Sequence, residues 1–134
     1  MTMTRNPAAR YQSNAVQTAP GPQLLVMLYD RLAADIEVAE RAMGERDYFV
    51  ANETVQHAQQ IVRVLRHSLN PDGFEGGQEL LSLYDFLIQH LVEANLEKNQ
   101  AKIRECGTIV APLQRAWHLA VVNPEGNDAA DHVG

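Results

Sequence analysis

The sequence predicts an all-α fold, an antiparallel four-helix bundle preceded by an N-terminal strap or short helix. Clusters of glycine, proline and asparagine divide the chain into four segments of roughly twenty residues, each about 30 Å long if helical. In every segment apolar residues recur at helical spacing. Hydrophobic residues make up 46% of the chain but aromatic residues only 6%, and a core of aliphatic side chains suits helices better than sheets. Four amphipathic helices with short connections pack as an antiparallel bundle.

The first helix is expected to begin directly after Pro20, with Gly21 as the N-cap and Pro22 at the first helical position. It ends at the polar cluster Gly44–Asp47. Its apolar face comprises Leu24, Leu28, Leu32, Ile36, Ala39 and Met43. This spacing places the six side chains on one side of the helix, toward the other three segments.

The second and fourth helices carry apolar stripes roughly 120° wide, which is ordinary for a bundle helix. The second helix ends before the loop Asn70–Gly77, and the fourth follows the break at Lys98–Gln100. The two stripes are Ala51, Val55, Ala58, Val62, Leu65 and Leu69, and Ile103, Cys106, Val110, Leu113, Trp117 and Val121.

Pro112 lies inside the fourth segment, where it removes one backbone hydrogen bond. Two outcomes are open: a bend in one continuous helix, or a break between Gly107 and Pro112. On a helical wheel Pro112 points away from the apolar stripe, and the apolar period continues through it. We therefore favour the bend.

The third segment has a wider apolar arc than the others. The arc comprises Leu80, Leu81, Leu83, Tyr84, Leu87, Ile88, Leu91, Val92 and Ala94. It covers about half of the circumference, more than the core of a four-helix bundle requires. Either this helix is the most central of the four, or part of its arc forms a groove for a partner's amphipathic helix.

The formal net charge of −6 makes nucleic acid an unfavourable partner, because an acidic domain repels phosphate groups. Cys106 is the only cysteine, so no internal disulfide can form. Met1–Arg10 lacks the apolar stretch of a secretory signal, and no apolar run approaches the ~20 residues of a membrane-spanning helix. These features predict a soluble cytoplasmic protein without membrane insertion.

No pattern of catalytic or metal-binding residues stands out. A di-iron bundle needs Glu-x-x-His on two helices, whereas Glu53 and His57 have i to i+4 spacing and lie outside the apolar stripe. None of His57, His67 and His90 is followed by the Lys and Gly expected in a phosphotransfer bundle. Cys106 lies in an apolar stripe and is expected in the core. The sequence therefore predicts no enzymatic activity, no metal and no cofactor.

Several sequence blocks resemble the flagellin-specific export chaperones, the FliS family. These blocks are YQSNAVQTA at Tyr11–Ala19, MLYD at Met27–Asp30, LYDFL at Leu83–Leu87, LVEAN at Leu91–Asn95 and AW at Ala116–Trp117. They occur in the family's order and at its spacing, and they cover about residues 10–122.

The resemblance implies a cytoplasmic export chaperone that binds the disordered C-terminal segment of flagellin. Such a chaperone prevents premature polymerisation and aids delivery to the flagellar type III secretion apparatus. It implies neither enzymatic activity nor a cofactor. Three parts are expected: a strap that caps the binding surface at 1–21, the bundle at 22–122 and a disordered tail at 123–134. Weak homodimerisation is one option. The alternative function is a generic helical-bundle interaction module for another amphipathic helix.

The residues expected to contact flagellin are Tyr11, Val16, Tyr29, Tyr84, Leu87, Leu91 and Asn95. Tyr11 and Val16 belong to the strap that the resemblance implies. For Tyr29 and Tyr84, a position at the edge of the core and a contact with the partner are both open. Asn95 either helps to end the third helix or hydrogen-bonds to backbone, of the bundle or of bound flagellin.

Deletion of residues 1–17 should expose apolar surface, because the third helix has more apolar surface than a core needs and the strap carries Tyr11 and Val16. We expect the deletion variant to bind more of a hydrophobic dye than the full chain, measured by dye fluorescence. Unchanged dye binding would argue against a capping role.

Overall fold

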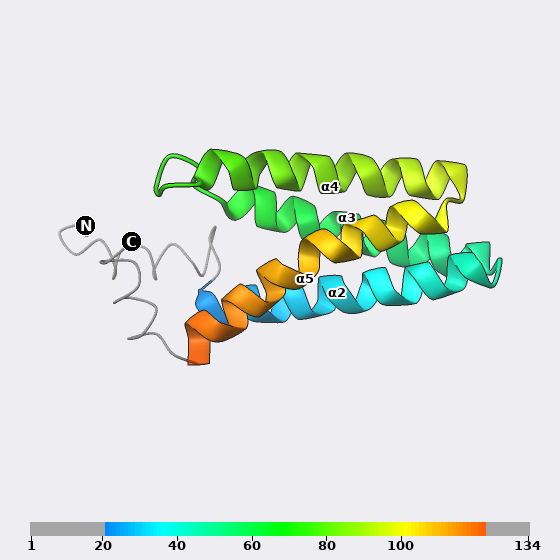
Figure 1. Cartoon of the computed structure of the whole chain (residues 1–134), viewed down its shortest axis with the longest axis horizontal. Coiled ribbons are helices and arrows are strands. Elements are labelled where there is room, and N and C mark those ends of the chain that lie inside the picture. Colours follow the sequence, from blue (N-terminus) through cyan, green and yellow to red (C-terminus); the bar gives the residue numbers. More distant parts are fainter. Residues whose placement is uncertain (1–20, 123–134) are drawn as a thin grey trace.

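The computed structural model describes residues 21–122 (Figure 1). The described chain forms four helices: α2 at Pro22–Gly44, α3 at Tyr48–Ser68, α4 at Gly77–Glu97 and α5 at Gln100–Val122. No strand occurs between residues 21 and 122. The predicted all-α bundle is confirmed, and the helices are separated at the predicted clusters of turn-forming residues.

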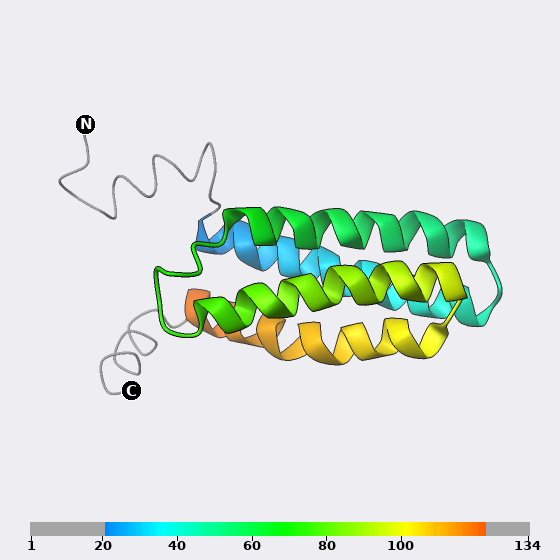
Figure 2. The same cartoon turned by 90° about the horizontal axis from the view of Figure 1, so that it is seen from above.

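The four helices run antiparallel in a ring, as Figure 1 and Figure 2 show from two directions. Each helix packs against two neighbours: α2 and α4 each contact both α3 and α5. The start of α2 and the end of α5 lie at one end of the bundle, here named the terminal end. The α2–α3 and α4–α5 connections lie at the opposite end, named the turn end. In such a ring no helix is more central than another, so centrality does not explain the wide arc of α4.

The starts of α2 and α3 are stabilised in different ways. Gly21 is the N-cap of α2 with an extended backbone (φ −75, ψ 174), and Pro22 occupies the first turn. Both positions were predicted, since glycine tolerates the cap and proline lacks the N–H that would remain unpaired there. Asp47 caps α3, because its side chain accepts a hydrogen bond of 3.3 Å from the backbone N–H of Val50.

The loop between α3 and α4 depends on glycine at two positions. Gly76 has a φ of +88, a conformation that L side chains rarely adopt. Gly77 is buried, and a Cβ atom there would lie 2.1 Å from the carbonyl oxygen of Pro71. The loop backbone therefore packs directly against the first turn of α4.

The core is built from the apolar stripes of all four helices. Its largest fully buried side chains are Tyr29, Leu32, Leu65, Leu87, Leu91, Ile103, Val55, Val62, Val110 and Cys106. Most of these lie at the positions that the sequence periodicity selected. Leu24 is an exception at 45% exposure, because it lies in the first turn of α2 at the terminal end.

The wide apolar arc of α4 is divided between the core and the two flanks of the helix. Tyr84, Leu87, Leu91 and Ala94 are buried. Half-buried side chains flank them at Leu80, Leu81, Leu83, Ile88 and Val92. A ring of four helices buries only the inner stripe, so the rest of the arc remains partly accessible along the helix.

Helix α5 is continuous from Gln100 to Val122 and includes Pro112 in its interior. Pro112 is exposed, so the missing hydrogen bond and the proline ring face solvent. The helix continues through Pro112, so the alternative of a break between Gly107 and Pro112 is wrong. Figure 1 shows α5 crossing the bundle obliquely, from beside α4 at the turn end to α2 at the terminal end.

Replacing Leu32 by alanine should lower the free energy of unfolding by about 2–5 kcal/mol, because this residue is fully buried and the change leaves a cavity. Leu119→Ala is the matched control. Leu119 is 68% exposed, so its truncation should change stability by less than about 0.5 kcal/mol. Urea denaturation followed by circular dichroism measures both, and equal losses would contradict the described core.

Candidate partner-binding surface

Four of the seven residues predicted to contact a partner lie in the core. The exposed fractions are 0% for Tyr29, Leu87 and Leu91 and 3% for Tyr84. Their side chains come from α2 and α4 and belong to one apolar cluster. These four side chains pack beneath the surface of the bundle and are not accessible to a partner.

The hydroxyl groups of Tyr29 and Tyr84 form a buried hydrogen bond that joins α2 to α4 across the core. Burial raises the pKa of Tyr29, and hydrogen bonding with Tyr84 and Trp117 offsets part of this effect. The pKa of Tyr84 is also raised, first by burial and then by the neighbouring Tyr29. Each hydroxyl gives the other a partner, so both rings can be buried without an unpaired polar group.

Asn95 is half-buried, and its side-chain N–H donates a hydrogen bond of 2.8 Å to Asn52 Oδ1. This bond links α4 to α3 near the turn end, so Asn95 pairs with a side chain of the bundle rather than with its backbone. Tyr11 and Val16 lie outside the described residues.

The first turns of α2 and the last turns of α5 together expose an apolar patch at the terminal end. It consists of Leu24, Met27, Leu119 and Val122, which are 45–79% exposed. Half-buried Leu25, Leu28, Leu113 and Trp117 pack against the core at the same end. We name these eight residues the terminal patch. Exposed apolar side chains on two neighbouring helix ends provide apolar area for a protein partner.

Asp30 holds the two helices of the terminal patch together. Its Oδ1 accepts hydrogen bonds from Gln114 Nε2 at 2.8 Å and from His118 Nε2 at 2.7 Å. The bonds from Gln114 and His118 lower the pKa of Asp30. These side chains are polar and partly solvated, so they fix the two helices side by side without covering the apolar residues.

The contacts between α4 and α5 leave Phe86 uncovered. Phe86 is 45% exposed and stacks on the ring of His90, with the centroids 4.7 Å apart. His90 Nε2 lies 2.6 Å from Glu105 Oε1 on α5, and Lys102 on α5 pairs with Glu93 at 3.1 Å. Polar bridges thus connect these helices beside an accessible aromatic ring.

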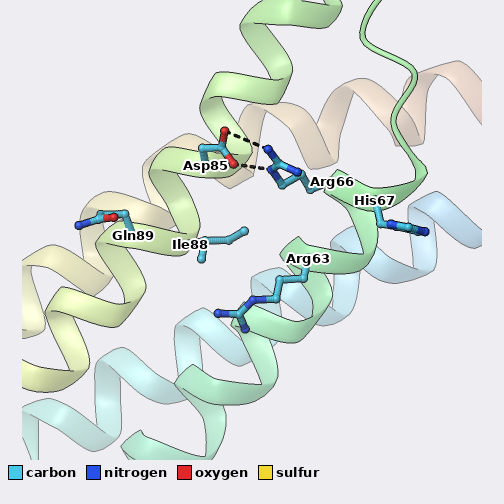
Figure 3. Close-up of a pocket in the computed structure, with 6 residues that line it drawn as sticks. All are labelled: Arg63, Arg66, His67, Asp85, Ile88 and Gln89. Carbon is cyan, nitrogen blue, oxygen red and sulfur yellow. Dashed lines mark hydrogen bonds and ion pairs between the residues drawn. The ribbon is translucent and has the colours of Figure 1, made fainter.

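A groove runs along the outside of the α3–α4 contact. It consists of three adjoining hollows with volumes of about 510, 290 and 240 Å³. Arg63 lines the first two, and Asn95 and Leu96 line the second and third. Figure 3 shows the first hollow: Ile88 lies between the helices, Arg66 pairs with Asp85, and Arg63 extends toward α4. We name it the α3–α4 groove.

Nothing in the described part of the chain indicates a catalytic or metal-binding site. Residues 21–122 contain no group of three or more His, Cys, Asp or Glu side chains that could hold a metal ion. Cys106 is buried, as predicted, and burial raises the pKa of its thiol to about 12, so the reactive thiolate is not formed at neutral pH. None of the described helices is long and apolar enough to cross a membrane.

Comparison with known proteins identifies the family of this chain. The family model described as flagellar protein FliS matches residues 4–124. The chain belongs to the FliS family. The flagellar secretion chaperone FliS of Bacillus subtilis is 31% identical over 117 residues, which are 87% of each chain. The FliS chaperones of Escherichia coli and Salmonella typhimurium are 26% and 28% identical over 113 and 106 residues, 83% and 78% of each chain.

Membership of the FliS family confirms the resemblance found in the sequence and assigns the chain a role as a flagellar secretion chaperone. A chaperone acts by contact with its client through its surface. The terminal patch and the α3–α4 groove are two candidate surfaces of this FliS chain within residues 21–122.

Sequence reasoning missed the residues of the α3–α4 groove, although a signal for them was present. Gln56, Gln59, Gln60 and Arg63 follow the spacing i, i+3, i+4, i+7, so they share one face of α3. No role was predicted for this polar face. Met27 was also missed: it belongs to the MLYD block, but a wheel of α2 alone does not show which of its side chains the neighbouring helices leave exposed.

In an alkaline titration Tyr29 and Tyr84 should ionise only as the protein unfolds. Their folded pKa values are raised, whereas tyrosine in an unfolded chain ionises near pH ~10. The stability that the neutral pair contributes is therefore complete below about pH 10 and is lost as the pH rises further. Phenolate absorbance and circular dichroism, recorded together, measure this. Full phenolate signal in a still helical protein would contradict the buried pair.

Proposed function

We propose that this FliS-family chain is a cytoplasmic chaperone that binds the disordered C-terminal segment of flagellin and prevents its premature polymerisation. It would then aid delivery of the subunit to the flagellar type III secretion apparatus. One observation carries the proposal: the family match covers residues 4–124. The helices within the matched range expose the terminal patch. The relatives are named flagellar secretion chaperones.

The surface has the properties that a disordered client requires. A segment that folds on binding must bury much apolar area, because its ordering costs several kcal/mol. The terminal patch provides part of this area through Met27 and Leu119, which are 64% and 68% exposed. The half-buried flanks of α4 provide more. Client side chains can pack on the terminal patch and on the flanks of α4 without displacing the buried residues beneath them.

We further propose that residues 1–21 cover the binding surface until the client arrives, with Tyr11 and Val16 as the apolar contacts. Strap and client would compete for the same area, which lowers the apparent affinity for the client. The benefit is a chaperone that does not expose a large apolar patch in its free state.

A peptide of the C-terminal segment of the cognate flagellin should bind the purified protein at micromolar concentration, measured by fluorescence anisotropy. Met27→Ser should weaken binding by about fivefold, because the apolar area of one exposed side chain is lost from the interface. Phe49→Ser is the matched control, since Phe49 is 74% exposed at the turn end.

Binding of an unrelated amphipathic helix in place of the flagellin peptide would contradict the proposed function. It would favour the generic interaction module instead. Equal weakening by Met27→Ser and Phe49→Ser would leave flagellin binding in place but would exclude the terminal patch as its main site.

A further inference from the structure

The two parts of α5 on either side of Pro112 are buried to different extents. All fully buried residues of the helix lie before the proline, at Ile103, Cys106 and Val110. Every side chain at 113–122 is half-buried or exposed. We name residues 113–122 the α5 flap; it lies beside α2 at the terminal end (Figure 1). Local opening costs least where few apolar side chains are buried, so the flap is the part of α5 that opens most easily.

The part of α5 before Pro112 packs closely on α2. Gly107 faces Ile36, and a Cβ atom added at Gly107 would lie 3.4 Å from Ile36 Cγ2. Arg104 pairs with Glu40 on α2 at 2.8 Å. With these contacts and three buried side chains, this part of α5 is expected to open only when the whole bundle unfolds.

Pro112 weakens the helix at the boundary between the two parts. It has no N–H group, so the carbonyl oxygen of Thr108, four residues earlier, loses the hydrogen bond of an uninterrupted helix. The hydroxyl of Thr108 donates to the carbonyl oxygen of Glu105 at 2.7 Å, and bonds of this kind often bend helices. Sharp bends in helices occur mainly at proline. A partial opening of α5 would therefore pivot at Pro112.

Two hydrogen bonds attach the α5 flap to α2, and both end on one atom. Asp30 Oδ1 accepts from Gln114 Nε2 at 2.8 Å and from His118 Nε2 at 2.7 Å. Gln114 and His118 are four residues apart, so they lie on the same face of the flap in successive turns. Half-buried Leu113 and Trp117 add apolar contacts. A single carboxylate thus fastens two turns of a segment that has no fully buried side chain.

We propose that the α5 flap opens as a unit about Pro112 while the rest of the bundle stays folded, and that Asp30 is the latch that keeps it closed. The flap carries Leu119 and Val122, which are the α5 half of the exposed apolar residues in the terminal patch. The closed flap holds them at the same end as the α2 half, and opening separates the two halves. The latch therefore controls whether the terminal patch exists as one surface.

Hydrogen exchange of the full chain, followed for single amides by NMR, tests the flap. The amides of residues 113–118 should share one protection factor, at least about tenfold lower than those of residues 104–111. A gradual decline from Val122 inward, with no step at Pro112, would indicate ordinary fraying of a helix end and would overturn the proposal. Equal protection on both sides of Pro112 would also overturn it.

Asp30→Ala should lower the protection of the flap about fivefold and leave residues 104–111 unchanged, because two partly solvated hydrogen bonds are lost. His118→Ala removes only one of the two bonds and should lower protection about two- to threefold. Asp85→Ala is the matched control. Asp85 is 52% exposed, compared with 45% for Asp30, and it also joins two helices, through Arg66. The control should leave the flap unchanged, and equal effects of Asp30→Ala and Asp85→Ala would exclude Asp30 as the latch.

Pro112→Ala should raise the protection of the flap at least about fivefold, because the new N–H can donate to the carbonyl oxygen of Thr108. Arg115→Ala is the control, since it places alanine at an exposed position of the flap without adding a backbone donor. Unchanged protection in Pro112→Ala would show that the proline is not the pivot and would overturn the proposal. No flagellin peptide enters these measurements, so a failure of the proposed function would leave their outcome unaffected.

Discussion

The structure depends on how much apolar surface a ring of four helices can bury. Each helix contacts two neighbours and directs one stripe inward, so apolar residues beyond that stripe remain at the flanks or ends. Helix α4 has more apolar residues than its stripe holds, and α2 and α5 carry apolar residues that stay exposed near the terminal end. The surfaces available to a partner are therefore a direct result of the same packing that stabilises the fold.

Polar side chains connect the helices at their margins without covering these surfaces. Asp30 joins α2 to α5, and the buried carboxylate of Asp35 on α2 accepts bonds from Arg31 and from His57 on α3. Exposed ion pairs contribute little to stability. Their value here lies in the alignment of neighbouring helices, which keeps the exposed apolar residues in a constant arrangement.

The fold could be predicted because helix periodicity and turn-forming residues are local signals. Gly21, Pro22 and Pro112 behave as their local chemistry requires. The surface was harder to predict, because the burial of a side chain depends on neighbouring helices that a helical wheel does not show. Tyr29 and Tyr84 could be placed at a core edge but not paired with each other, since they are far apart in sequence. Gln59 is only 8% exposed although it lies on a polar face of α3, and the wheel of a single helix does not show that burial.

Trp117 is the only tryptophan of the chain, and it is half-buried within the terminal patch. Its indole lies near Tyr29, whose pKa it lowers, so its fluorescence reports on both the core and the surface above the core. Tryptophan emission depends on the polarity around the ring, and here no second indole obscures the signal. The fluorescence of Trp117 would therefore change where a client displaces water from the terminal patch. Occupancy of the patch can be followed in this way on unlabelled protein in real time.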